Sequence, residues 1–401
     1  MTVSPARPGR GASPRTARAI NDRLALRLLQ REGPLTAAQL KELTGMSRPS
    51  VADLVERLQK SGLIEVVGEA GEARRGPNAR LYGIVADRAY VAGLDVRIES
   101  IGVEVADLLG RTAARAERPV PVGADLAGLV ESGVELLLAT AREAGAAALH
   151  TVACGAPGQV DPGSGRMRPS GALPAWHGAL VDEVRRRLGV PVLLENEVNL
   201  AAVAEQRARS LAGAPEDETF VLLWIGGGVG AGVVLDGRLR RGVSGGAGEV
   251  GFLPVSATGG VPRADDCDDG YHGMVGSRAV CALGRSHGLA VDPAADAAAA
   301  AALVRSALAC GADGFLDALA ERIALGAAAV CAVLDPGVVV LAGEVGSAGG
   351  PELAARTAAA FARISPLRTD FHVSETAAPV LRGAVTVAMD AAQLDVFAPP
   401  A

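Results

Sequence analysis

Residues 36–58 read TAAQLKELTGMSRPSVADLVERL, a pattern typical of two short helices joined by a tight bend. Thr36 is placed to cap the first helix, and Gly45 lies in the bend, where a residue that tolerates a positive φ is favoured. Ser47 is a good N-cap for the second helix, and Pro49 suits its first turn. The apolar residues of that helix form one stripe, namely Val51, Leu54, Val55 and Leu58. The stretch predicts a helix-turn-helix whose second helix enters the DNA major groove; an ordinary helical hairpin on an enzyme surface is the alternative.

The flanking sequence adds a third helix and a wing. Residues 17–32 have helical spacing, LIEVVGE (63–69) reads as a strand, and ARRGPNARLYGIV (73–85) reads as a turn followed by a second strand. Arginines at a hairpin tip suit phosphates or a narrow minor groove. A winged helix-turn-helix domain is therefore expected over 17–86. The residues predicted to contact DNA are Thr36, Ser47, Arg48, Pro49, Ser50, Arg57, Arg74, Arg75, Asn78 and Arg80.

Charge is spread unevenly along the 401 residues, whose formal net charge is −6. Residues 1–88 hold 15 Lys+Arg against 9 Asp+Glu, and the remainder holds 24 against 36. A basic head on an acidic body fits a DNA-binding module joined to a sensor or enzyme, although chance asymmetry gives the same count. Residues 1–16 combine Pro, Gly, Ser and Arg without periodicity, so we expect a disordered basic arm, either a plain tail or a minor-groove contact.

The five cysteines form no CxxC pair and their number is odd, which disfavours a disulfide framework and favours a reducing cytoplasm. We expect neither a signal peptide nor a membrane span, because the start of the chain has no apolar h-region and no long stretch is free of glycine and charge.

From Tyr90 onward, strands and helices alternate, which predicts an α/β body with parallel strand pairing. Residues 90–110 read as a buried strand, a turn and an alternating strand. Two glycine-rich strand-turn-strand units, near 93–110 and 221–240, suggest an internal duplication. Helices are expected over 124–144, 178–188, 198–210, 314–333, 351–362 and 383–393, and further strands over 150–157, 190–196, 337–343 and around 379–381.

Four segments carry a resemblance to a known family: GAPGQVD (155–161), GVPVLLENEVNLAAVAE (189–205), WIGGGVGAGVVLDGRLRRGVSGGAGEVGFLPV (224–255) and VVVLAGEVGSAG (338–349). They resemble the ROK family of sugar kinases and derived repressors, and the winged helix places the chain in the regulator branch. The resemblance implies an N-terminal winged helix-turn-helix followed by a duplicated actin-like, ribonuclease H-like ROK body of two lobes. The first lobe would span 89–203 plus the C-terminal helix 383–393, and the second would span 204–382.

The family's phosphate-binding turn Asp-Ile-Gly-Gly-Thr is altered here. The matching residues are Asp95, Val96, Arg97, Ile98 and Glu99. Without the two glycines the backbone cannot approach phosphate closely, and Glu99 places a carboxylate beside it. At about 4 Å, two like charges repel by roughly 1–4 kcal/mol. The ATP site is therefore degraded, and kinase activity is expected to be lost, with no catalytic residue.

The family's sugar and zinc residues are only partly kept. Its Asn-Asp pair becomes Asn196-Glu197, its sugar-contacting Glu matches Glu249, and its zinc-binding His becomes Phe252. Only Cys267 survives of the three zinc cysteines, so neither a metal nor another cofactor is expected. The residues predicted to bind a ligand are Asn196, Glu197, Glu249, His177 and Phe252. Two structural alternatives stay open: Asn196 caps helix 198–210, and Glu249 satisfies backbone amides of the glycine-rich loop.

The sequence thus predicts a cytoplasmic repressor that binds a DNA operator and senses a sugar or related metabolite, as a homodimer or homotetramer without a membrane partner. Two alternatives remain, a ligand-free dimeric DNA-binding regulator and a sugar kinase with a DNA-binding appendage.

Overall fold

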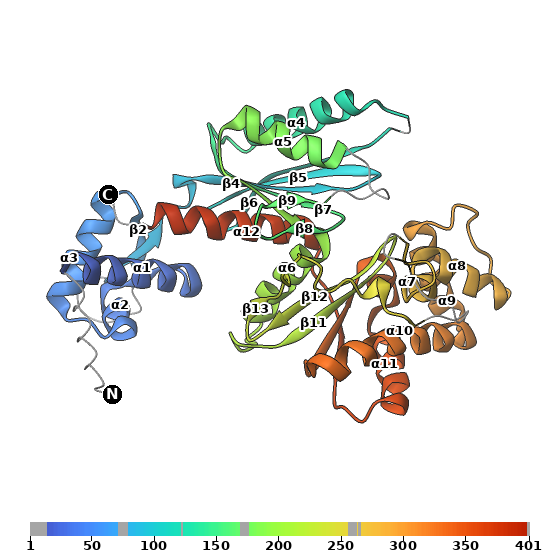
Figure 1. Cartoon of the computed structure of the whole chain (residues 1–401). Coiled ribbons are helices and arrows are strands. Elements are labelled where there is room, and N and C mark those ends of the chain that lie inside the picture. Colours follow the sequence, from blue (N-terminus) through green and yellow to red (C-terminus); the bar gives the residue numbers. More distant parts are fainter. Residues whose placement is uncertain are drawn as a thin grey trace, which may run out of the picture.

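A small head and a body of two sheets make up the protein, and Figure 1 shows the head set apart from the body and joined to it along the long helix α12. The computed structural model describes residues 14–70, 79–121, 123–168, 176–255, 263 and 266–398. Among these residues, no helix is both long and apolar enough to cross a membrane.

The head contains three helices and a three-stranded sheet. Its elements are α1 (Pro14–Glu32), β1 (Leu35–Thr36), α2 (Ala37–Thr44), α3 (Arg48–Lys60), β2 (Ile64–Ala70) and β3 (Ala79–Ile84). The strands are antiparallel in the order β1-β3-β2, and the helices bury Leu26, Leu40 and Leu54 between them. The expectation of disorder over 1–16 is wrong for 14–16, because α1 begins at Pro14, a residue without a backbone N–H that suits a first helical turn. Residues 1–13 lie outside the described residues.

The first sheet of the body has five strands in the order β10-β7-β4-β5-β6. The short helix η1 (Ala86–Arg88) leads into it. Its strands are β4 (Tyr90–Val96), β5 (Ser100–Asp107), β6 (Thr112–Pro119), β7 (Leu149–Ala156) and β10 (Val192–Asn196), with helices α4 (Leu126–Glu143) and α5 (Trp176–Leu188). A small hairpin, β8 (Val160–Asp161) and β9 (Arg166–Met167), follows β7.

Strand β5 is buried along residues 101–106, so the alternating exposure expected there is wrong. Helix α4 packs on the strand and so does α12 (Pro379–Val396), and therefore neither face meets water. The polar member of the alternation, Glu104, is 1% exposed and accepts a hydrogen bond from the Thr112 hydroxyl at 2.7 Å. Its carboxylate also forms an ion pair with Arg382 of α12, so pairing offsets the loss of hydration.

The second sheet has the order β13-β12-β11-β14-β15. Its strands are β11 (Phe220–Ile225), β12 (Val229–Leu235), β13 (Arg238–Leu239), β14 (Val338–Ala342) and β15 (Asp370–Val373). The helical elements of this half are η2 (Val250–Phe252), α7 (His272–Val275), α8 (Ser277–Ser286), α9 (Ala297–Cys310), α10 (Asp313–Leu334) and α11 (Gly343–Ile364). The strand expected around 379–381 is wrong. Pro379 begins α12 there, and Val380 and Leu381 belong to its buried face together with Ala384 and Val385.

The two sheets repeat one topology, which confirms the internal duplication. Strands β4, β7 and β10 run parallel, and β5 and β6 extend that sheet antiparallel. Strands β11, β14 and β15 run parallel in the same way, and β12 and β13 extend that sheet antiparallel. Each half has its own apolar core.

Two equivalent helices join the halves. Helix α6 (Glu197–Leu211) follows the last strand of the first half but packs on β11 and β12 of the second, whereas α12 follows the second half and packs on β4, β5 and β7 of the first. The two helices meet at Gly383, where an added Cβ would lie 1.9 Å from the Leu200 carbonyl oxygen. Only glycine allows backbones to approach this closely. The expected lobe boundary at 203/204 falls inside the continuous helix α6.

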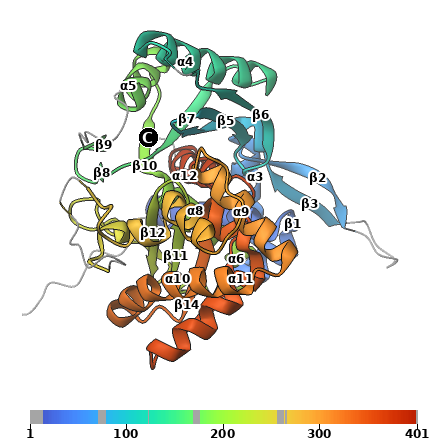
Figure 2. The same ribbon diagram turned by 90° about the vertical axis from the view of Figure 1, so that its right-hand side faces the viewer.

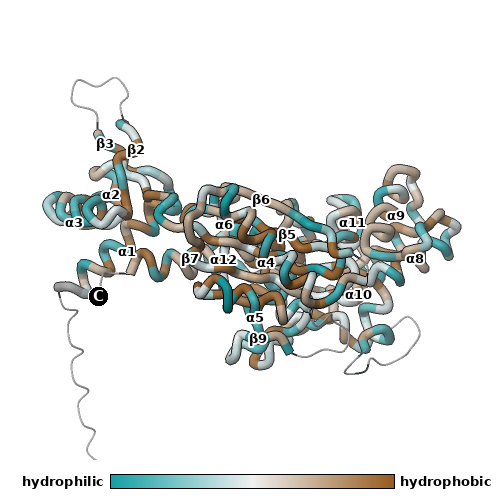
Figure 3. The backbone as a smooth tube through the Cα atoms, turned by 90° about the horizontal axis from the view of Figure 1, so that it is seen from above, coloured by the Kyte–Doolittle hydropathy of each residue, from teal (hydrophilic) through white to brown (hydrophobic). Residues whose placement is uncertain are grey.

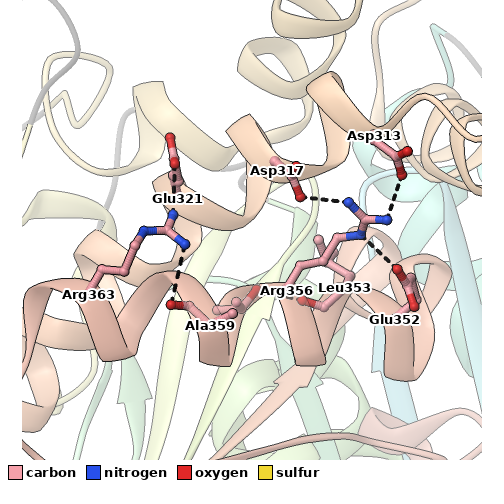
Figure 4. A network of polar contacts seen from close by, with 9 residues as sticks. Asp313, Asp317, Glu321, Glu352, Leu353, Arg356, Ala359 and Arg363 are labelled. Carbon is pink, nitrogen blue, oxygen red and sulfur yellow. Dashed lines mark hydrogen bonds and ion pairs between the residues drawn. The ribbon is translucent and has the colours of Figure 1, made fainter.

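Helices α10 and α11 are tied together by ion pairs on the outside of the second half (Figure 4). The Arg356 guanidinium lies 2.6 Å from Asp317, 2.7 Å from Asp313 and 2.8 Å from Glu352. About two turns further along α11, Arg363 pairs with Glu321 at 2.8 Å. Because isolated exposed pairs contribute little, the shared use of Arg356 by three carboxylates is what gives this network weight.

The C-terminal end of α12 enters the core of the head. Phe397 is 6% exposed and packs with Leu26, Leu29 and Leu58 in the same cluster. Beside this contact, Arg31 of α1 pairs with Glu216 of the body at 3.3 Å. A cavity of about 800 Å³ lies between α1 and the ends of α6 and α12. The head therefore rests on the body mainly through one helix end.

Candidate DNA-binding surface and interlobe site

Helix α3 lies at the end of the head away from the body, and its tube is largely hydrophilic in Figure 3. Ser47 caps the helix, accepting from the Ser50 backbone N–H at 3.3 Å, and the two hydroxyls are 2.8 Å apart. Arg48, Pro49 and Ser50 are exposed in the first turn, while Val51 begins the buried stripe. The expected division of α3 into an inner and an outer face is confirmed, and its N-terminal residues are free to meet base edges.

Two of the predicted DNA contacts have structural partners instead. Thr36 is 7% exposed, and its hydroxyl accepts from the Gln39 backbone N–H at 3.2 Å in a capping box that begins α2. Arg57 pairs with Asp22 of α1 at 2.5 Å and also with Asp53. The pairing with Asp22 raises the pKa of Arg57 and holds α3 against α1. Thr36 and Arg57 therefore have structural roles in the head, and their contacts with DNA stay predictions.

The wing is a hairpin of β2 and β3 that projects from the head in Figure 2. Strand β2 is exposed along most of its length, and Arg80 is exposed where β3 begins. The predicted contacts Arg74, Arg75 and Asn78 lie outside the described residues.

The second candidate site forms where the parallel strands of both sheets end. The carboxyl ends of β4, β7 and β10 carry Asp95 to Arg97, Gly158 with Gln159, and Asn196 with Glu197. On the other sheet, β11 ends at the Gly226–Gly228 loop and β14 ends at Gly343 and Glu344. In open α/β sheets this edge is where ligands bind. We call this group of residues the interlobe site.

An arginine joins the two halves at this site. The Arg97 guanidinium donates to Asp95 at 2.8 Å and to Glu344 at 3.2 Å, across 247 positions of sequence. Gly226 lies so close to Glu344 that a Cβ added to Gly226 would lie 1.9 Å from the Oε2 atom of Glu344. Gly343 has a φ of 77°, and an added Cβ would lie 2.5 Å from the Ile225 carbonyl oxygen. The carboxylate of Glu344 thus rests on the glycine loop that follows β11.

The Asn196 side chain both caps α6 and positions Glu197. Its oxygen accepts from the backbone N–H groups of Val198 and Asn199 and so caps α6, which confirms the structural alternative. Its amide donates to the Gly158 carbonyl and to Glu197 Oε2, both at 3.0 Å. Asn196 therefore fixes Glu197 beside the loop that follows β7.

The carboxylates of this site are poorly hydrated. Burial raises the pKa of Glu197 to about 8, and the charges of Asp95 and Glu249 add to that effect. Burial also raises the pKa of Asp95, which is 7% exposed, and that of Glu249, where a hydrogen bond from Gln159 opposes the effect. The site is therefore rich in carboxyl groups and can accept hydrogen bonds from hydroxyl or amine groups.

His177 and Phe252 are the remaining predicted ligand residues. His177 is fully buried against Trp176, with ring centroids 4.4 Å apart, and burial lowers its pKa to about 4. Its two ring nitrogens have no hydrogen-bond partner among the described residues. Phe252 is partly buried at the end of η2, three positions after Glu249. The roles of both in binding stay predictions.

Sequence reasoning missed Glu344, Glu195 and Arg241. Glu195 is 6% exposed and accepts from Asn199 at 2.9 Å, and its other oxygen pairs with Arg241 of the second half. A charged residue at the end of the apolar run 190–194 was a usable signal for Glu195. Nothing in the local pattern at Glu344 points to Arg97.

The residues at the family's zinc position do not fit zinc. Cys267 is the one thiol there, Phe252 has no donor atom, and His272 lies 4.0 Å from Asp268. Within the described part of the chain, no three His, Cys, Asp or Glu side chains are grouped so as to hold a metal. A four-ligand site cannot be built from this donor set.

Sequence comparison identifies relatives of both parts. The sequence model described as ROK family matches residues 91–365, and the one described as MarR family matches residues 19–75. The xylose repressor of Caldicellulosiruptor bescii is 23% identical over 239 residues, which cover 59% of this chain and 59% of that protein. The DNA-binding transcriptional dual regulator NagC of Escherichia coli is 24% identical over 265 residues, covering 64% of this chain and 61% of that protein. The chain spans about three fifths of the length of the curated relatives it matches.

Solved structures extend the likeness to the arrangement of head and body. A ROK family transcriptional regulator, described as a homolog of the E. coli MLC protein, superposes with a TM-score of 0.74 over 95% of this chain and 98% of its own, at 18% identity. A ROK hexokinase from Thermus thermophilus superposes with a TM-score of 0.59 over 76% of this chain and 99% of its own, at 26% identity. The first likeness includes the winged helix and shows the fold.

Proposed function

The chain belongs to the ROK family, and from that premise we propose that it is a DNA-binding transcriptional repressor whose body senses a sugar or a related small metabolite. The observation that carries the proposal is the attachment of an outward-facing recognition helix to a family body through α12. The curated relatives reported above are a repressor and a transcriptional regulator, which supports a regulator over an enzyme.

We further propose that the protein works without nucleotide and without metal. Arg97 replaces glycine in the first phosphate turn, and the Glu344 carboxylate rests on the second glycine loop. A nucleotide phosphate would have to displace this internal ion pair and then sit beside several carboxylates. These contacts count against the sugar kinase, which remains the enzyme alternative.

The ligand site would be connected to the head by two helices. Asn196 and Glu197 begin α6, α6 packs on α12 at Gly383, and α12 ends with Phe397 in the head core. An effector that binds one relative position of the lobes more tightly would thereby shift the equilibrium between two positions of the head. The size of that shift is limited by the difference between the binding free energies of the effector for the two states. A ligand-free regulator would lack this dependence.

A second copy of the chain would place two recognition helices about 34 Å apart on a pseudo-palindromic operator. We therefore propose a homodimer or homotetramer acting in the cytoplasm.

Selection of bound sequences from a random DNA pool, followed by titration of the selected site, tests the proposal. Arg48→Ala should weaken binding to the selected site by about 1–3 kcal/mol if Arg48 reads a guanine. Arg115→Ala, an exposed position on β6, is the matched control and should bind like the wild type. An equal loss on random DNA would make Arg48 a phosphate contact, and failure to enrich any sequence would contradict the proposed function.

A further inference from the structure

The charges of the interlobe site select among sugar-like ligands. At this site Arg97 is shared by Asp95 and Glu344, and the nearby Arg241 is paired with Glu195. Glu197 and Glu249 add two further carboxyl groups near these residues. A ligand entering here meets more acceptors than donors and finds both guanidinium groups already paired.

Asp95 and Ser277 each place at the site a buried polar atom without a partner among the described residues. The Oδ1 atom of Asp95, in a residue that is 7% exposed, has no hydrogen-bond partner in the described part of the chain. Ser277 is 4% exposed, and its hydroxyl is likewise unpaired. Its backbone N–H donates to the Gly226 carbonyl at 3.0 Å, so the hydroxyl lies beside the glycine loop. Unpaired buried polar groups are costly, and a ligand rich in hydroxyl groups would satisfy both.

Glu344 occupies the space a phosphate would need. Its Oε2 atom is buried without a partner against Gly226, and the Gly226 N–H is already donated to the Gly228 carbonyl at 3.0 Å. Phosphate binding requires free backbone N–H groups or unpaired cations. Here the Gly226 N–H is used within the loop, and the Glu344 carboxylate lies against the same residue.

We propose that the effector is a polyhydroxy molecule that carries no negative charge, and that this site rejects the phosphorylated form of the same molecule. The proposal rests on the interlobe site being the effector site, as put forward above. Burial raises the pKa of Asp95, Glu197 and Glu249, and neighbouring carboxylates add to the effect at Asp95 and Glu197. An uncharged or amine-bearing sugar matches this surplus of acceptors.

The test is calorimetric titration of the full-length protein with matched pairs of probes: glucose and glucose 6-phosphate, N-acetylglucosamine and its 6-phosphate, glucosamine and its 6-phosphate, and xylose and its 5-phosphate. We expect at least one unphosphorylated member to bind and its ester to bind at least about 10-fold more weakly, which is about 1.4 kcal/mol. Tighter binding of the ester would overturn the charge inference and leave the sugar-sensing function standing. No binding by any member, from protein that still binds its selected DNA, would overturn the effector site and this inference with it.

A charge-removing variant sharpens the result. Glu344→Gln keeps the size of the side chain and removes one negative charge from the glycine loop. It should reduce the discrimination against the phosphate ester, whereas Glu143→Gln, at an exposed position of α4, should leave it unchanged. Unchanged discrimination in Glu344→Gln, with the ester still rejected, would show that Glu344 is not the rejecting group.

Discussion

At the scale of single residues, Glu197 shows how an environment changes what a side chain does. The Asn196 amide donates a hydrogen bond to the Glu197 carboxyl group. Burial, with the nearby carboxylates adding to the effect, raises the pKa of Glu197 to about 8. Near neutral pH Glu197 is therefore largely protonated and can donate a hydrogen bond as well as accept one. A carboxyl group acting as a general base at this position would need the opposite state, since a base must be ionised to take a proton.

The raised pKa of Glu197 makes a prediction about stability. Between the ordinary value of 4.5 and about 8, the unfolded chain loses this proton while the folded protein keeps it, so the free energy of unfolding falls as pH rises through that range. Glu197→Gln removes this loss. The free energy of unfolding of the variant, relative to that of the wild type, should therefore rise by roughly 2–4 kcal/mol from pH 5 to pH 9.

Urea unfolding at several pH values measures this difference. Glu143→Gln, an exposed control, should show no pH-dependent gain. A constant difference between wild type and Glu197→Gln across the range would contradict the raised pKa.

At the scale of elements, the contact of α6 with α12 decides how the halves are held. These helices meet at Gly383, where an added Cβ would lie 1.9 Å from a backbone oxygen that cannot move aside alone. Gly383→Ala should separate the helices and lower the free energy of unfolding by about 2 kcal/mol or more, as overpacked cores do. Thermal or urea unfolding of the full chain measures the change.

Gly178 supplies the matched control for that substitution. It lies in α5, where an added Cβ meets nothing within 4 Å. Gly178→Ala should therefore raise stability by about 0.5–1 kcal/mol, since alanine restricts the unfolded chain and favours the helix. If both substitutions changed the free energy of unfolding in the same direction, close packing at Gly383 would not explain the effect of Gly383→Ala.

At the scale of the whole molecule, the head depends on the far end of the chain. Phe397 completes a core whose other buried members lie in residues 25–84, while the cavity beside α1 leaves much of the interface open. Phe397→Ala removes a nearly fully buried ring, a change that costs about 3–5 kcal/mol in well-packed cores. We expect the head to unfold at a lower temperature than the body, and DNA binding to be lost first.

Differential scanning calorimetry with DNA titration on the same samples tests this coupling. Leu394→Ala, at a side chain that is 58% exposed on the same helix, is the control and should change stability by less than about 0.5 kcal/mol. An unchanged melting profile for Phe397→Ala would show that the head is stable without the end of α12.

Much of the fold and part of the site could be predicted from the sequence. The caps at Thr36, Ser47 and Asn196 and the apolar stripe of α3 lie where local spacing places them. The strand expected near 379–381 was wrong because a short apolar run fits a helix face as well as a strand, and Pro379 decides for the helix. Thr36 and Arg57 each have a partner within the head, and their contacts with DNA stay predictions.

The sequence by itself determined the winged helix, the duplicated α/β body and the loss of glycine from the phosphate turn, since each depends on caps, periodicity and residue types a few positions apart. Only the tertiary structure decided that Arg97 pairs with Glu344, that burial raises the pKa of Glu197 and that Phe397 lies in the head core. These features join residues from different parts of the chain. They depend on burial and distance after both sheets have formed, and no local pattern carries that information.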